Sequence, residues 1–168
     1  MKVLKFLFLV LLFSTTIFSS NAQTAQKKLP DVSVKTLDGR SVNIQDYAQK
    51  GKVTVVSFWA TWCAPCKKEL EAIAEDYPSW QKKYDMELVA VTIDDARALP
   101  KVKALVEQKG WKYKILSDVN GDLKRAFNIQ SIPFTLLVDK KGNIVYTHSG
   151  YAPGDEEELE KRIQLAAK

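Results

Sequence analysis

The most constraining feature of the sequence is an apolar run that passes almost directly into a helix carrying two cysteines. Val53–Trp59 is rich in β-branched and aromatic residues, which predicts a strand buried on both faces. From Cys63 onward apolar residues recur at helical spacing, and Cys66 falls one turn into that helix. A strand buried on both faces needs a covering layer on each side, so the chain is expected to form a sheet between helices.

Alternating strand and helix patterns extend this arrangement along the chain. Further strands are expected at 86–93, 113–116, 134–138 and 144–148, and further helices at 101–109, 121–127 and from about 155 to the C-terminus. A hairpin is expected over 31–42, because Asp38-Gly39 suits a turn with positive φ. These elements predict one α/β domain of three layers, with no second domain and no internal repeat.

Two local signals bear on where helices begin and end. Pro78 is expected to end or kink the helix that starts at Cys63, which would leave 79–84 as a separate turn or two. At the last helix, Asp155 with Glu158 three residues later fits a capping box. The acidic residues around them are therefore interpreted as capping groups and not as a metal site.

The first residues predict an export signal. A basic start is followed by the apolar run 6–13 and then by a polar stretch that ends in small residues, which is the layout of a secretory signal peptide. An uncleaved anchor is the alternative, but the run is shorter than the ~20 apolar residues that a spanning helix needs. The expected organisation is a cleaved signal peptide over 1–22, a flexible lead-in over 23–28, and a folded domain over 29–168. The domain is then expected in the periplasm or on the extracytoplasmic side of a membrane, touching the membrane only through an uncleaved leader.

The net charge of +5 at neutral pH says little about partners, because the basic residues are interspersed with acids. A nucleic-acid-binding protein would more often carry a basic stripe, so no nucleic acid partner is expected.

The chain has two cysteines, three positions apart. A disulfide stabilises mainly by closing a long loop of the unfolded chain, and this pair closes a very short one. A domain of this length can also build a sufficient core unaided. The pair Cys63 and Cys66 therefore indicates redox chemistry more than structural cross-linking.

The position of the pair at the start of a helix has a chemical consequence. Unpaired N–H groups and the helix dipole favour a negative charge there, which is expected to lower the pKa of the Cys63 thiol below the free value of about 8.5. Cys66 lies one turn further in, shielded and close enough to attack a mixed disulfide on Cys63. Pro65 suits the first helical turn, where a missing N–H costs nothing.

The segment Phe58-Trp-Ala-Thr-Trp-Cys-Ala-Pro-Cys-Lys67 resembles the active-site segment of thioredoxins. Residues 29–168 as a whole resemble the exported TlpA/ResA-like branch. The resemblance implies a thioredoxin fold, an α/β/α arrangement with a central mixed sheet, an N-terminal β-hairpin, and a helix-bearing insert after Ile93. It also implies a thiol-disulfide oxidoreductase with no cofactor or metal beyond its own Cys63–Cys66 disulfide. Electrons would come from a membrane thiol carrier and pass to exported proteins such as apocytochromes c.

The resemblance implies roles for particular residues. Cys63 and Cys66 would be the catalytic pair. Pro133 would be a cis-proline facing the cysteines, and the backbone of Ile132 would pair with an extended substrate segment. Trp62 would form part of the surface that contacts the substrate.

One position departs from thioredoxin. Ser57 stands where thioredoxins carry a buried acid six residues before the first cysteine, and serine cannot act as a base at neutral pH. Glu69 matches an acid that tunes thiol titration in ResA-like proteins and is the natural substitute; a solvated surface acid is its alternative interpretation. His148, the single histidine of the sequence, is interpreted as structural.

Two other functions are alternatives. A peroxiredoxin-like peroxidase shares the fold, but it would carry Thr or Ser three residues before its reactive cysteine, where this chain has Ala60. A copper(I)-binding thiol module is also compatible with the Cys-x-x-Cys pair, whereas structural zinc requires four ligands.

Overall fold

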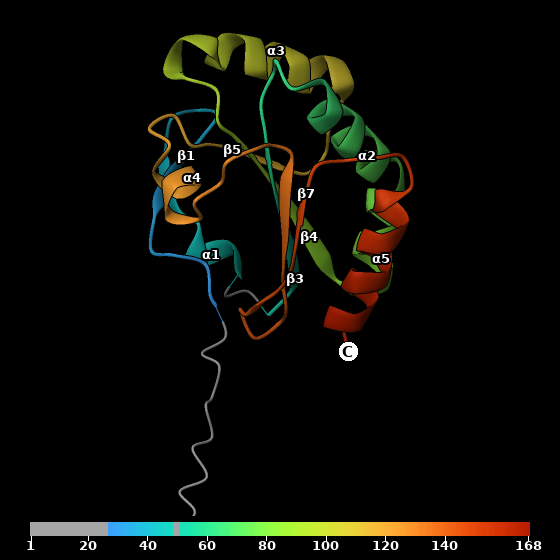
Figure 1. The fold of residues 1–168 in the computed structure, drawn as a ribbon. Helices are drawn as coiled ribbons and strands as arrows, with labels where there is room; N and C mark the ends of the chain where they lie inside the picture. Colours follow the sequence, from blue (N-terminus) through green and yellow to red (C-terminus); the bar gives the residue numbers. More distant parts are fainter. Residues whose placement is uncertain (1–26, 49–50) are drawn as a thin grey trace, which may run out of the picture.

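The computed structural model describes residues 27–48 and 51–168 (Figure 1). The expected signal peptide and residues 23–26 of the expected lead-in lie outside the described residues. Lys27 and Lys28 already belong to the domain: the Ile144 N–H donates to the Lys27 carbonyl at 2.7 Å, and Lys28 forms an isolated bridge with Asn143.

The elements follow the predicted order. The strands are β1 (Ser33–Thr36), β2 (Ser41–Asn43), β3 (Val53–Trp59), β4 (Met86–Thr92), β5 (Lys114–Ser117), β6 (Phe134–Val138) and β7 (Ile144–Ser149). The helices are α1 (Gln45–Ala48), α2 (Ala64–Tyr84), α3 (Leu99–Lys109), α4 (Asp122–Ala126) and α5 (Asp155–Ala166), with a 3-10 turn at Ala96–Ala98 before α3.

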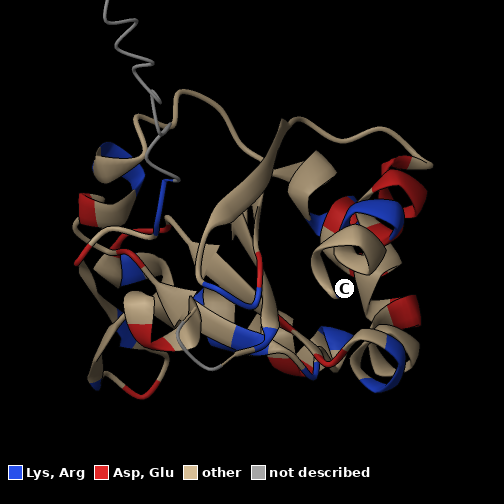
Figure 2. Cartoon of the chain, turned by 90° about the horizontal axis from the view of Figure 1, so that it is seen from below, with Lys and Arg blue, Asp and Glu red and all other residues tan. Residues whose placement is uncertain are grey.

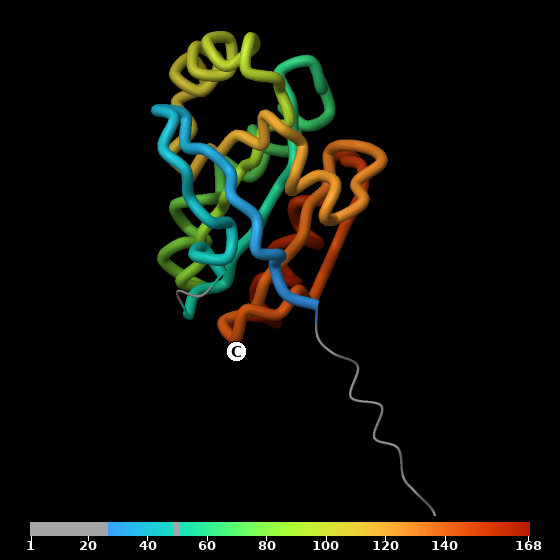
Figure 3. The backbone as a smooth tube through the Cα atoms, turned by 90° about the vertical axis from the view of Figure 1, so that its left-hand side faces the viewer, coloured from blue at the N-terminus to red at the C-terminus, as the bar shows by residue number. Residues whose placement is uncertain are grey.

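The strands form one mixed sheet in the order β2-β1-β5-β4-β3-β6-β7. The central β3 pairs parallel to β4 and antiparallel to β6. The predicted hairpin is β1–β2, which adds to the sheet through β5 and forms its edge (Figure 3). The predicted insert between β4 and β5 carries α3.

Alternating side chains of β3 divide the core into two halves, one on each face of the sheet. Val53 and Val55 pack with residues of α2, α3 and α5, whereas Val56 and Phe58 pack with residues of α1 and α4. The predicted three-layer α/β arrangement is confirmed. By the same alternation Ser57 faces α2, on the side of the cysteines.

The β3–α2 junction lies at one end of the domain, and both ends of the described chain lie at the opposite end (Figure 1). Basic and acidic residues are interspersed over the view from below (Figure 2). Among the described helices, none has the length and apolar character needed to cross a bilayer.

The expectation that Pro78 leaves 79–84 as a separate turn or two is wrong, because α2 runs without interruption from Ala64 to Tyr84. Tyr77, Trp80 and Tyr84 are all buried against the sheet-facing core. An internal proline costs a helix about 3 kcal/mol. Burying large side chains contributes roughly 2 kcal/mol each, which offsets that cost and keeps the last two turns helical.

The capping box expected at Asp155 does not form, although α5 does begin there. Gly154 is the N-cap, with φ of 103°, and no side chain caps the helix. The Asp155 carboxylate instead turns back and accepts the Ala152 N–H at 2.7 Å. A side-chain cap needs an N-cap residue in the β region, and the left-handed Gly154 does not provide one.

Candidate active site

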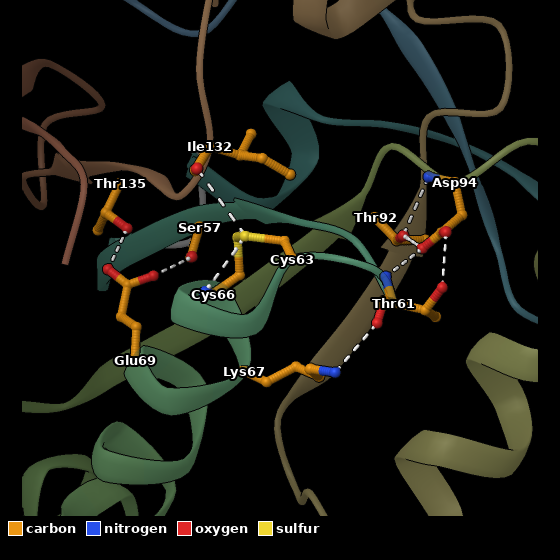
Figure 4. Close-up of a disulfide and its surroundings, with 10 residues drawn as sticks. All are labelled: Ser57, Thr61, Cys63, Cys66, Lys67, Glu69, Thr92, Asp94, Ile132 and Thr135. Atoms are coloured by element: carbon orange, nitrogen blue, oxygen red, sulfur yellow. Dashed lines mark hydrogen bonds between the residues drawn. A yellow bond between two sulfur atoms is a disulfide. The ribbon is translucent and has the colours of Figure 1, made fainter.

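A disulfide joins Cys63 and Cys66 at the N-terminus of α2, directly after β3 (Figure 4). Cys63 is the N-cap residue, and its Sγ accepts the Cys66 N–H at 3.3 Å. Cys66 is fully buried, while Cys63 keeps a small exposed fraction. Pro65 falls in the first turn of the helix, as expected. The helix N-terminus is therefore aimed at the Cys63 sulfur, the arrangement that stabilises a thiolate when the disulfide is reduced.

The cis-proline loop faces this sulfur. The Ile132–Pro133 peptide bond is cis, and the Ile132 carbonyl oxygen lies 3.8 Å from Cys63 Sγ. Gly150 N–H donates to the Pro133 carbonyl at 2.8 Å, which ties the loop to the end of β7. The structure thus brings Ile132 and Pro133, far away in sequence, to the disulfide.

An exposed groove of about 270 Å³ lies beside the disulfide and is lined by Trp62, Ile93, Lys124, Gln130, Ser131 and Ile132. The Trp62 side chain is 66% exposed, one of three large exposed apolar side chains in the described residues. An exposed tryptophan next to a reactive group is typical of a contact surface, which is the role that the sequence predicts for Trp62.

Glu69 is buried beneath the site, so it is not the solvated surface acid of the alternative interpretation. One carboxylate oxygen accepts the Ser57 hydroxyl at 3.0 Å and the other accepts the Thr135 hydroxyl at 2.7 Å (Figure 4). Burial raises the pKa of Glu69 above the usual range for glutamate, against the opposing effect of the two hydroxyl donors. Glu69 lies three residues after Cys66, so both occupy one face of α2.

Asp94, which was not predicted from the sequence, holds the loop between β3 and α2. Its buried carboxylate accepts the Thr61 N–H at 2.8 Å, the Thr61 hydroxyl at 2.9 Å and the Thr92 hydroxyl at 2.6 Å. Lys67 Nζ donates to the Thr61 carbonyl at 3.2 Å from the other side. An acidic residue directly after the buried strand β4, at the same sheet edge as the cysteines, was the available signal.

Replacing Asp94 by alanine is expected to destabilise the oxidised protein by about 2–4 kcal/mol, because three buried donors lose their acceptor. Urea unfolding measures this loss. The exposed Asp95 is the matched control, since it caps the 3-10 turn and pairs with Arg97 at the surface; its alanine variant should lose about 1 kcal/mol or less. Equal losses in the two variants would show that Asp94 does not hold the loop.

A thioredoxin-like domain with a Cys-x-x-Cys disulfide at a helix N-terminus, opposite a cis-proline, defines a thiol-disulfide oxidoreductase. The AhpC/TSA family model matches residues 25–147. The chain is 30% identical to a thiol-disulfide oxidoreductase ResA of Bacillus thuringiensis subsp. konkukian, over 82% of this chain and 77% of the relative. The chain therefore belongs to the AhpC/TSA family and, within it, to the ResA-like thiol-disulfide oxidoreductases.

Solved structures agree with this assignment. The solution structure of a thioredoxin-like protein from Porphyromonas gingivalis superposes with a TM-score of 0.74 at 44% identity, covering 83% of this chain and 91% of that one. The crystal structure described as a thiol:disulfide interchange protein DsbE from Chlorobium tepidum has a TM-score of 0.74 at 26% identity, covering 85% and 97%. The predicted thioredoxin fold is confirmed.

Proposed function

We propose that this protein reduces disulfide bonds of exported proteins, with Cys63 as the attacking thiol and Cys66 as the resolving thiol. The observation that carries the proposal is the position of the Cys63 sulfur. It lies at the N-terminus of α2, next to the Ile132 carbonyl and the exposed groove, while Cys66 is fully buried behind it. Only the first sulfur is placed to meet a substrate disulfide.

The proposed cycle has two exchange steps. The Cys63 thiolate attacks a substrate disulfide, forming a mixed disulfide and releasing one substrate thiolate, which takes a proton from water. Cys66 then loses its proton and attacks the Cys63 sulfur, which re-forms the internal disulfide and releases the second substrate thiolate. Two electrons and two protons must restore the dithiol, and the proposed donor is a membrane thiol carrier. The cycle needs no cofactor beyond the Cys63–Cys66 disulfide.

The geometry supports an extended protein segment as the substrate. The Ile132 backbone lies beside Cys63, so a substrate strand that pairs with it would carry its disulfide to the sulfur. Trp62, which also lines the groove, offers apolar contact area to the substrate. The position of Glu69 and Cys66 on one face of α2 supports Glu69 as the acceptor of the Cys66 proton.

The sequence supports a location outside the cytoplasm. Residues 1–22 have the layout of a signal peptide, and the TlpA/ResA-like resemblance favours apocytochromes c among the clients. Exported proteins with closely spaced cysteines are then the substrate class, because such cysteines oxidise in that compartment.

The reduction potential of the Cys63–Cys66 pair in glutathione buffers tests the reducing direction. We expect a value closer to that of thioredoxin, about −270 mV, than to that of DsbA, about −120 mV. Insulin reduction by the dithiol form should accompany it. A potential near that of DsbA would overturn the reductase assignment. Fast peroxide consumption that depends on Cys63 would favour the peroxidase alternative, and stoichiometric copper retention without reductase activity would favour the copper(I) module.

A further inference from the structure

Glu69 must exchange protons with solvent, but neither of the two hydroxyl groups that it bonds is exposed. Its side chain is buried, and one hydroxyl partner, Ser57, is fully buried as well. If Glu69 accepts the Cys66 proton in every cycle, that proton must reach solvent before the next one. Ser57 lies on the side of the cysteines, from which the proton comes, and Thr135 lies on the opposite side of the carboxylate (Figure 4), so the outward path leads past Thr135.

The strand pairing places His148 on that side. Thr135 on β6 is directly opposite His148 on β7 in the antiparallel register. Directly opposed residues project on the same face of a sheet, so the imidazole shares a face with the hydroxyl that donates to Glu69. Exposure alternates along β7, with His148 half-buried and Thr147 exposed on the opposite face. His148 therefore lies between the Glu69 network and the surface.

A small cavity that is partly open to solvent is lined by both groups. Glu69, Thr135, His148 and Asp155 all line it, together with Tyr146 and Tyr151. Its volume of about 10 Å³ is close to the space that a single water molecule requires. The cavity that both groups line is therefore about large enough to hold one water molecule.

The imidazole is fixed at the surface by a second carboxylate. His148 Nε2 lies 3.2 Å from Asp155 Oδ2, and both side chains are 36% exposed. Asp155 is itself anchored by the Ala152 N–H at 2.7 Å. The ring also stacks on Tyr146, with centroids 6.3 Å apart. A histidine held in this way can take a proton from one side and lose it to water on the other.

We propose that His148, held by Asp155, is a positioning residue that carries protons between Glu69 and solvent during thiol-disulfide exchange; this inference rests on the proposed function. When Cys66 attacks the mixed disulfide, its proton moves to the Glu69 carboxylate. The proton then passes through the cavity to the free imidazole nitrogen, and His148 releases it to bulk water. No electrons move in this relay, and the S–S bond forms and breaks as in the cycle above.

The charges around the relay act in opposing directions. A protonated His148 lowers the pKa of Glu69, while the Asp155 carboxylate raises it. The groups that face the imidazole are Asp155 and Glu156 from α5, Tyr151 from the preceding loop, Tyr146 from β7 and Glu69 from α2. Once a neutral imidazole has taken the proton, its positive charge stabilises the Glu69 carboxylate that remains, which is the state needed for the next proton from Cys66.

His148→Gln tests the relay. The reduced protein is mixed with oxidised glutathione, and the resolution of the mixed disulfide is followed by stopped-flow tryptophan fluorescence from pH 5.5 to 9. We expect resolution to be about tenfold slower near neutral pH, because one proton-transfer group is lost. Added imidazole should restore the rate, and the reduction potential should stay unchanged. Thr147→Gln is the matched control on the same strand and should behave as wild type.

The outcomes separate the relay from other roles. A wild-type rate in His148→Gln, or a slow rate that imidazole does not restore, would overturn the proposal. Should His148→Gln fold poorly, Asp155→Asn provides a second variant, since the amide still accepts the Ala152 N–H but cannot balance an imidazolium; an unchanged pH profile there would count equally against the relay. Wild-type protein that exchanges no disulfide at all would instead refute the proposed function.

Discussion

Cys66→Ser is expected to stop turnover at a stable mixed disulfide, and Cys63→Ser is expected to reduce disulfide exchange to the uncatalysed rate. The Cys63 sulfur accepts a backbone N–H at the helix N-terminus and lies next to the carbonyl of Ile132, a residue that lines the groove, so it can still attack when Cys66 is absent. The resolving attack then has no nucleophile. Cys63→Ser loses the sulfur that a substrate can reach, because Cys66 is fully buried.

The intact mass of each variant after mixing with oxidised glutathione measures this difference. Cys66→Ser should gain one glutathione per chain, and dithiothreitol should remove it. Cys63→Ser, which retains one cysteine in the same helix, is the matched control and should remain unmodified. Equal adducts on the two variants would contradict the assignment of unequal roles. Reduced Cys66→Ser would form the same kind of stable mixed disulfide with a protein client, which would allow the client to be identified.

Much of this arrangement could be predicted because it depends on local signals. The apolar pattern of Val53–Trp59 predicts a central strand, and the turn residues Asp38-Gly39 predict the edge hairpin; both are confirmed. The position of Cys63 at a helix N-terminus follows from the same pattern. The facing cis-proline does not, since cis bonds at proline are uncommon. Pro133 was predicted through the resemblance to thioredoxins alone.

The remaining parts of the site depend on tertiary contacts that no local pattern contains. Pro78 alone predicts a helix break, but buried aromatic residues on both sides of it stabilise α2 as one helix. Asp94 follows β4 at the sheet edge of the cysteines, but its contact with Thr61 depends on the parallel pairing of β4 with β3. The Glu69 network joins side chains from α2, β3 and β6, so the burial of this acid follows from the packing of three elements.

Glu69→Gln is expected to stabilise the oxidised protein increasingly as the pH rises. Since burial raises the folded-state pKa of Glu69, the folded chain binds this proton more tightly than the unfolded chain does. The wild type therefore loses stability as the pH rises from the unfolded value, about 4.3, through the raised folded value, at about 1.4 kcal/mol per pH unit between them. Glutamine does not titrate and can still bond both hydroxyls, so the variant escapes this loss.

Urea unfolding of the oxidised proteins at a series of pH values measures the effect. The difference in unfolding free energy should be small below the unfolded pKa, grow through the window, and become constant above the folded pKa of Glu69. Glu71→Gln is the matched control on the same helix, because its half-exposed carboxylate pairs with Lys109 at the surface; its effect should stay within about 1 kcal/mol at every pH. A pH-independent difference would contradict a raised pKa at Glu69.

The same Glu69→Gln variant should slow the resolution of the mixed disulfide by about 100-fold near neutral pH, because Cys66 loses its proton acceptor. The deficit should shrink at high pH, where the Cys66 thiol ionises without help. Greater stability together with slower resolution is the combination expected of a buried acid retained for chemistry at a cost to the fold. A variant that is more stable yet resolves at the wild-type rate would leave Glu69 without a part in the exchange.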